Sequence, residues 1–178
     1  MTSLVAFTVL VALIGLERLA ELVVSTRNAA WSFERGGVES GRGHYPVMVA
    51  LHSGLLVAML VEAWVRRPDV APLLAWSMLA LVLASQALRW WCIATLGRRW
   101  NTRVIIVPGL TPVASGPYRL LPHPNYVAVV VEGVALPLVH AAWLTALVFT
   151  LANAALLVVR IRVEDAALRT LPGRLADA

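Results

Sequence analysis

Residues 125–159, NYVAVVVEGVALPLVHAAWLTALVFTLANAALLVV, form an apolar run of 35 residues in which Glu132 is the only charged side chain. As a single α-helix this run would be roughly 52 Å long, whereas the hydrocarbon core of a bilayer is about 30 Å thick. Residues 137–142 begin with a proline and provide a turn. The run therefore predicts two short membrane-spanning helices, residues 124–139 and 142–160, that form a helical hairpin.

Three further apolar runs precede this one, at residues 4–24, 46–65 and 72–96. Charged residues make up 14% of the chain, whereas soluble domains contain about 25%. We therefore predict an all-α, polytopic integral membrane protein with about five transmembrane helices, folded as a single domain over residues 1–178. We expect residues 97–123 to form a polar loop and residues 160–171 to form an amphipathic helix at the end of the chain.

The arginines predict the orientation in the membrane. If the N-terminus lies outside, the outer connections hold only Arg66 and Arg67. The inner segments then hold eleven arginines, which are Arg27, Arg35, Arg42, Arg98, Arg99, Arg103, Arg119, Arg160, Arg162, Arg169 and Arg174. The positive-inside rule favours this orientation. All fifteen basic residues are arginine, and a chain without lysine that is rich in Ala, Leu and Val suggests a GC-rich bacterial gene. We therefore expect a bacterial cytoplasmic (inner) membrane protein.

The same charges bear on binding partners. Because the arginines flank apolar runs, anionic membrane lipid is a better expected partner than nucleic acid. The chain has a single cysteine, Cys92, so it cannot form an internal disulfide, and its histidines and cysteine show no metal-site spacing. We expect no bound metal.

The stretch 116–126, GPYRLLPHPNY, contains residues suited to a binding site. Proline is favoured in the first turn of a helix, and the residue before a proline is biased towards extended geometry. A helix therefore begins at Pro124 with His123 at its cap, and the free N–H groups of Asn125 and Tyr126 face the inner interface, where they attract anions. The alternative is a rigid turn that only joins a loop to a span.

Two further features allow two interpretations each. Arg160 and Glu164 have i,i+4 spacing and share a helix face, so they form either part of a site or a surface ion pair. Glu132 lies alone within an apolar span, where an ionisable group costs a few kcal/mol unless it faces protein or water. It either pairs with an arginine such as Arg89 or lines a pocket.

Together these motifs resemble the isoprenylcysteine carboxyl methyltransferase family, which is related to the phospholipid methyltransferases of membranes. The family has Gly-x-Tyr, then Arg-His-Pro-x-Tyr, then an arginine and paired acidic residues after the last span. Here these are Gly116-Pro117-Tyr118, His123-Pro124-Asn125-Tyr126, and Arg160 with Glu164-Asp165. Pro122 stands where the family usually has arginine, so we expect this part of the site to differ. The N-terminal half resembles a bacterial subgroup that is associated with type III polyketide synthases and methylates alkylpyrones or alkylresorcinols.

The resemblance implies S-adenosylmethionine as the cofactor and a lipophilic small molecule as the methyl acceptor. The cofactor would be admitted from the cytosol and bound by the loop 97–123 and the helix after it. By position, its binding residues would be Arg103, Leu110, Thr111, Pro112, Val113, Tyr118, His123, Pro124, Asn125, Tyr126 and Glu164. Arg160 and Glu164 would be catalytic, and Arg160 and Glu132 would contact the acceptor. The acceptor is either an alkylpyrone or alkylresorcinol hydroxyl or a prenylcysteine carboxylate.

Two other functions compete with an O-methyltransferase. A small transporter would carry polar residues along several spans and broken helices near the midplane, whereas here the polar residues gather at one face. A non-catalytic scaffold or haem protein would need suitably placed ligands, but His52, His123 and His140 are expected at different depths.

Overall fold

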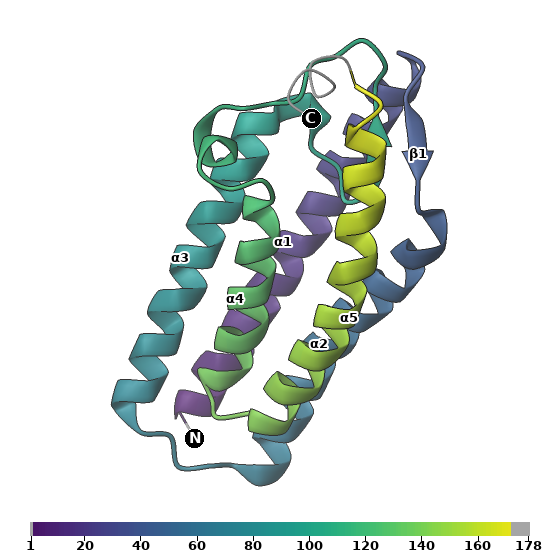
Figure 1. Ribbon diagram of the computed structural model, residues 1–178. Helices are drawn as coiled ribbons and strands as arrows, with labels where there is room; N and C mark the ends of the chain where they lie inside the picture. Colours follow the sequence, from purple (N-terminus) through teal and green to yellow (C-terminus); the bar gives the residue numbers. More distant parts are fainter. Residues whose placement is uncertain (1, 172–178) are drawn as a thin grey trace.

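The computed structural model describes residues 2–171, and five α-helices running up and down beside one another account for most of them (Figure 1). They are α1 (Thr2–Phe33), α2 (Tyr45–Arg66), α3 (Pro72–Leu96), α4 (Pro124–Leu138) and α5 (Trp143–Leu168). Four segments are long and apolar enough to cross a membrane, namely α1, Arg42–Arg66, Pro72–Arg99 and α5, whereas α4 is shorter. The predicted all-α, polytopic membrane fold is confirmed.

Prolines mark the beginnings of three helices. Pro46, Pro72 and Pro124 lie in the first turns of α2, α3 and α4, where the missing N–H group of proline removes no helical hydrogen bond. Two of these helices end at a residue with positive φ. Arg67 follows α2 with φ 42°, and Gly97 follows α3 with φ 53°. Local sequence chemistry therefore sets these boundaries.

Two helices extend beyond the expected apolar runs. α1 continues past the expected run 4–24 and ends at Phe33. Residues 25–35 contain neither glycine nor proline, and the next glycine is Gly36. α5 continues to Leu168, so residues 160–168 belong to the hairpin helix and do not begin a separate one. Nothing between Trp143 and Leu168 breaks a helix, since this segment contains neither glycine nor proline. The limits of the membrane spans stay predictions, and Arg174 lies outside the described residues.

A small antiparallel sheet joins two loops at one end of the bundle. The strand β1 (Val38–Ser40) pairs with β2 (Val104–Ile106), with Val38 opposite Ile106. Figure 1 shows this sheet, the α3–α4 loop and the end of α5 at one end, with the start of α1 and the α2–α3 connection at the other. The arginine-rich connections therefore gather at the end that carries the sheet. The sequence did not predict this pairing.

The apolar core fills the half of the bundle opposite the sheet. Its members come from the beginning of α1, the end of α2, the middle of α3 and both sides of the α4–α5 turn, and include Phe7, Met59, Val82, Leu136 and Phe149. Gly133 lets α4 approach α5 closely, because a Cβ atom at this position would overlap the Phe149 ring. This packing leaves the other half of the bundle for polar groups and cavities.

The outward faces of the helices are also apolar. Leu13, Leu19, Leu83, Leu147 and Leu151 are all exposed. A helix that is apolar all round needs either a protein interior or a membrane around it. These exposed faces agree with an integral membrane protein.

Candidate active site

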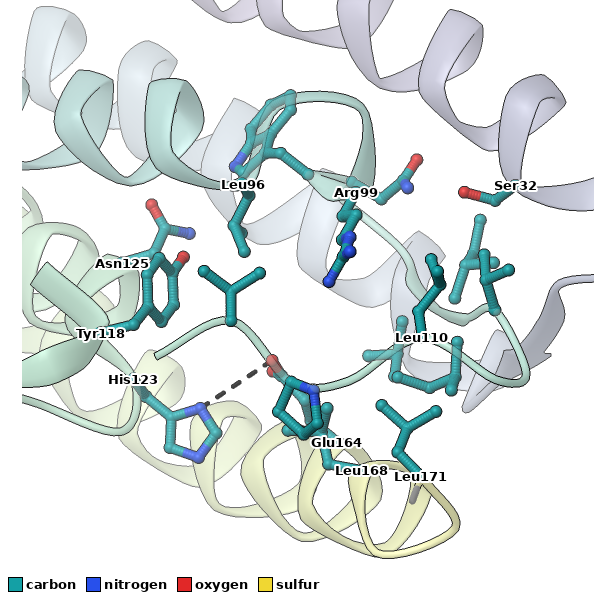
Figure 2. Close-up of a pocket in the computed structure, with 18 of the residues that line it drawn as sticks. Ser32, Leu96, Arg99, Leu110, Tyr118, His123, Asn125, Glu164, Leu168 and Leu171 are labelled. Carbon is teal, nitrogen blue, oxygen red and sulfur yellow. Dashed lines mark ion pairs between the residues drawn. The ribbon is translucent and has the colours of Figure 1, made fainter. Parts of the chain in front are cut away.

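A cavity opens at the sheet end of the bundle, between the α3–α4 loop, the beginning of α4 and the end of α5 (Figure 2). We call it the loop cavity. Its lining includes eleven residues predicted to bind the cofactor or acceptor, which are Arg103, Leu110, Thr111, Pro112, Val113, Tyr118, His123, Asn125, Tyr126, Arg160 and Glu164. Pro122 lines it too. Pro124 does not, since it is fully buried at the start of α4. Residues from the loop and from two helices thus meet around one space.

Arg160 is buried and directs three hydrogen bonds to three different parts of the chain. Its Nε donates to the Tyr126 hydroxyl at 2.9 Å, one terminal nitrogen contacts Met48 Sδ at 2.9 Å, and the other donates to the Thr102 carbonyl oxygen at 2.6 Å. The Tyr126 hydroxyl in turn donates to Glu164. Tyr126 therefore connects Arg160 to Glu164, one turn apart on α5.

His123 precedes α4 and faces the acidic pair on α5. Its Nε2 lies 3.1 Å from Asp165 Oδ1, and its Nδ1 lies 3.9 Å from Glu164 Oε1 (Figure 2 marks the latter pair). The His123 ring also stacks on the Tyr126 ring, with 5.3 Å between ring centroids. The beginning of α4 and the end of α5 are thus joined by polar contacts on one side of the loop cavity.

Tyr118 enters the cavity from the short 3₁₀ helix η3 (Gly116–Arg119). Gly116 has φ 54° and packs against α3, where a Cβ atom would lie 2.6 Å from Thr95 Oγ1. Burial, together with the neighbouring Cys92 thiol, raises the pKa of the Tyr118 phenol above its usual range. Tyr118 therefore lines the cavity as a neutral phenol across the ordinary pH range.

A second cavity lies between the helices, deeper in the bundle, and we call it the helix cavity. Apolar side chains of α2, α4 and α5 form much of its lining, among them Val49, Leu56, Val129, Leu156 and Leu157. The loop and helix cavities have volumes of about 180 and 160 Å³, many times the 10–15 Å³ that a single water needs (~1.4 Å probe). Each has room for part of an organic ligand.

The two cavities share a wall made by Trp100, Asn101, Asn125, Tyr126 and Arg160. Several buried polar atoms of this wall have no hydrogen-bond partner within residues 2–171, namely Trp100 Nε1, Asn101 Oδ1 and Nδ2, and Asn125 Oδ1. Buried polar groups are nearly always paired in folded proteins, so the wall is suited to a polar ligand. The sequence prediction missed Trp100 and Asn101, although both lie in the polar loop it singled out.

Glu132 does not line the helix cavity itself, but its ion-pair partners do. Its carboxylate pairs with Arg18 at 2.7 Å and with Arg89 at 3.0 Å, and Arg18 also pairs with Glu21. Arg18, Glu21 and Arg89 line the helix cavity, whereas Glu132 is not among its lining residues. Of the two interpretations of Glu132, the ion pair with Arg89 is therefore found. The described residues include no group of three or more side chains placed to hold a metal, and the absence of a metal stays a prediction.

Comparisons with known proteins agree with these motifs. Residues 77–170 match the model of the Isoprenylcysteine carboxyl methyltransferase (ICMT) family. This region contains the whole α3–α4 loop, α4 and α5. The chain is also 35% identical over 164 residues to YpbQ of Bacillus subtilis (strain 168), described as an uncharacterized protein, and the alignment covers 92% of this chain and 96% of that protein. No solved structure matches.

Proposed function

Because the chain belongs to the isoprenylcysteine carboxyl methyltransferase family, a family of membrane methyltransferases, we propose that it transfers a methyl group from S-adenosylmethionine to an oxygen atom of a lipophilic small molecule. The observation that carries this proposal is the pair of cavities that meet at Asn125, Tyr126 and Arg160. One cavity is formed largely by loop residues, several of them charged or polar, and the other lies among apolar helices. A water-soluble donor and a lipophilic acceptor need such an arrangement.

The loop cavity fits the cofactor in charge and polarity. S-adenosylmethionine carries a carboxylate, an ammonium group, a sulfonium centre and several hydroxyl groups. The cavity offers cationic Arg99 and Arg103, the carboxylate of Glu164, and the unpaired polar atoms of Asn101 and Asn125. When bound, the cofactor would supply an electrophilic methyl group on a positively charged sulfur.

The helix cavity fits the acceptor. The apolar side chains of α2, α4 and α5 suit a hydrocarbon tail, while the polar wall suits the oxygen to be methylated. The acceptor is an alkylpyrone or alkylresorcinol hydroxyl or a prenylcysteine carboxylate. A hydroxyl is favoured because Arg160 already donates to three partners and Arg18 and Arg89 are paired with carboxylates. A carboxylate would enter without an unpaired cation to balance it, which is costly in a buried site.

Catalysis then depends mainly on positioning. A direct displacement needs the acceptor oxygen held about 3 Å from the methyl carbon and aligned with the bond that breaks, and such alignment contributes several kcal/mol. Arg160, fixed by its three contacts, orients the acceptor oxygen at the shared wall. Glu164 accepts the hydroxyl proton by way of the Tyr126 hydroxyl, which already bonds to Glu164. His123 and Asp165 hold this turn of α5 against α4.

The proposed orientation places this site at the cytosolic surface. The sheet and the loop cavity lie at the end of the bundle where the arginine-rich connections gather (Figure 1). The positive-inside rule assigns that end to the cytosol, where S-adenosylmethionine is made and used. The N-terminus would then lie outside, and the membrane would be the inner membrane of a bacterium.

The test is incubation of the purified protein in detergent with S-adenosylmethionine labelled in the methyl group. We expect calorimetry to detect cofactor binding, and we expect label to enter the organic phase with an alkylpyrone, an alkylresorcinol or a prenylcysteine. His123→Ala should weaken cofactor binding by at least about tenfold, as loss of a hydrogen bond to a charged group predicts. Absence of cofactor binding by the wild-type protein would exclude the proposed function.

A further inference from the structure

The helix cavity has polar atoms without a hydrogen bond at a second place, away from the shared wall. Asn153 on α5 is 3% exposed and Arg89 on α3 is 7% exposed, and both line the cavity. Among the described residues, Asn153 Oδ1 and Arg89 Nε make no hydrogen bond, and Arg89 Nε has only a long ion-pair contact of 3.8 Å to Glu21 Oε1. A buried polar atom without a hydrogen bond costs about 1–3 kcal/mol, and two such atoms line this one cavity.

The position of these atoms is set by the two helices that carry them. Asn153 precedes Arg160 by two turns of α5, which is ~10 Å along the helix axis. Arg89 is held by Glu132, which contacts a terminal nitrogen of the guanidinium at 3.0 Å, while Glu21 Oε1 lies 3.8 Å from Nε. Arg89 comes from α3 and Asn153 from α5, and Glu132 of α4 holds Arg89. This deeper level of the cavity is therefore built from packed helices and does not depend on a loop.

On the basis of the acceptor role proposed above, we propose that Arg89 and Asn153 form a second recognition point, which binds a polar group on the acceptor that lies deeper than the methylated oxygen. The two atoms without a hydrogen bond offer one donor, Arg89 Nε, and one acceptor, Asn153 Oδ1. A hydroxyl group complements both because it accepts one hydrogen bond and donates another.

The spacing also restricts the acceptor. The ~10 Å interval along α5 separates backbone positions, and the long Arg160 side chain and a hydrogen bond at each end leave a shorter span between two oxygens of the acceptor. A ring that carries two oxygen functions spans this distance. A prenylcysteine presents only hydrocarbon at the deeper level and leaves both polar atoms without a hydrogen bond. The second recognition point therefore selects doubly oxygenated rings.

The experiment compares two acceptors that differ in a single hydroxyl group, an alkylresorcinol and the alkylphenol with the same alkyl chain. The measured quantity is the ratio of their kcat/KM values, which does not depend on the fraction of protein that folds. We expect the wild-type protein to favour the resorcinol by roughly tenfold or more, since one buried hydrogen bond accounts for that difference. In Asn153→Leu this ratio should fall close to one.

Two further variants make the comparison specific. Thr150→Val removes a polar group one turn away on α5, where Thr150 Oγ1 bonds only to the Ala146 carbonyl oxygen of its own helix, and it should keep the wild-type ratio. Arg89→Lys keeps the positive charge beside Glu132 but removes Nε, and it should lower the ratio as Asn153→Leu does. An unchanged ratio in both Asn153→Leu and Arg89→Lys would overturn the second recognition point.

The remaining outcomes separate this inference from the proposed function. Cofactor binding without methylation of either compound would overturn the recognition point and leave the methyltransferase proposal standing. A wild-type ratio near one would do the same, because the deeper polar atoms would then be satisfied by water. Failure to bind S-adenosylmethionine would overturn both.

Discussion

Arg160 and Tyr126 are joined by a hydrogen bond of 2.9 Å from the buried guanidinium Nε to the tyrosine hydroxyl. The same hydroxyl donates to Glu164. The i,i+4 spacing of Arg160 and Glu164 allowed either a direct ion pair or a shared site, and the Tyr126 hydroxyl of the neighbouring helix lies between the two side chains. The end of α5 and the beginning of α4 are thus linked through one oxygen atom, and a ligand in the loop cavity would contact this linkage.

Removal of that oxygen should weaken cofactor binding. Tyr126→Phe leaves Arg160 Nε and the Glu164 carboxylate without their common partner, and hydrogen bonds to charged groups contribute about 1.5–3 kcal/mol. We expect the affinity for S-adenosylmethionine, measured by calorimetry in detergent, to fall by roughly tenfold to a hundredfold. Because Glu164→Gln disrupts the same linkage, the double variant should lose little more affinity than the worse single variant.

Tyr45→Phe is the matched control for this cycle. The Tyr45 hydroxyl lies 3.4 Å from Thr102 Oγ1 and faces the helix cavity, not the loop cavity. Its removal should leave cofactor affinity within about twofold, since only a long contact between neutral groups is lost. Fully additive losses in Tyr126→Phe and Glu164→Gln would show that the two side chains act independently.

Gly116 should be irreplaceable for a steric reason. Gly116→Ala and Gly109→Ala both place a side chain at positive φ, 54° and 80°, which costs about 1–2 kcal/mol. Only at Gly116 would the added Cβ meet a neighbour, Thr95 Oγ1 at 2.6 Å, while Gly109 has open space around it. Both variants should melt at lower temperatures, but only Gly116→Ala should displace Tyr118 and lose roughly tenfold or more in cofactor affinity. Equal affinities in the two variants would contradict a positioning role for this turn.

Glu132 should be important for stability. It pairs with both Arg18 and Arg89 in the interior of the bundle, and removing one partner from a buried ion pair costs about 3–5 kcal/mol. Glu132→Gln should therefore lower the free energy of unfolding in detergent by an amount of that order. The control variant is Glu34→Gln. Glu34 and Arg35 are both exposed and form an ion pair of 3.7 Å, and exposed pairs contribute little to stability. Similar unfolding curves for Glu132→Gln and the wild-type protein would show that the cluster is dispensable.

The sequence predicted those parts of the fold that depend on neighbouring residues. The beginnings of α2, α3 and α4 follow from prolines, whose fixed φ acts locally. The cluster of His123, Asn125, Tyr126, Arg160 and Glu164 in one cavity followed from motifs and from the expectation that α4 and α5 form a hairpin.

The parts that escaped prediction depend on residues far apart in the chain. Arg18 reaches Glu132 across 114 positions, and β1 meets β2 across two helices. Membrane helices also give little sign of which face packs inward, because the lipid-facing and core-facing sides are both apolar. Asn153 is an example, since nothing in its apolar surroundings indicated that it would face a cavity.

The orientation of the protein can be tested by cysteine labelling of intact bacterial cells. Cys92 is fully buried, and Cys92→Ser provides a background without thiols in which Asp69→Cys and Ala114→Cys are made separately. Asp69 lies exposed in the α2–α3 connection, and Ala114 lies exposed in the α3–α4 loop beside the loop cavity. Since the positive-inside rule assigns the arginine-rich end to the cytosol, a membrane-impermeant maleimide should label the cysteine at position 69 and not the cysteine at position 114.

Permeabilised cells provide the control, because there both cysteines should react to a similar extent. A protected position 69 together with a labelled position 114 would place the loop cavity outside the cell, away from the cytosolic supply of S-adenosylmethionine. That pattern would exclude the proposed orientation while leaving the fold intact. Labelling of both positions in intact cells would show that the two ends of the bundle do not lie on opposite sides of the membrane.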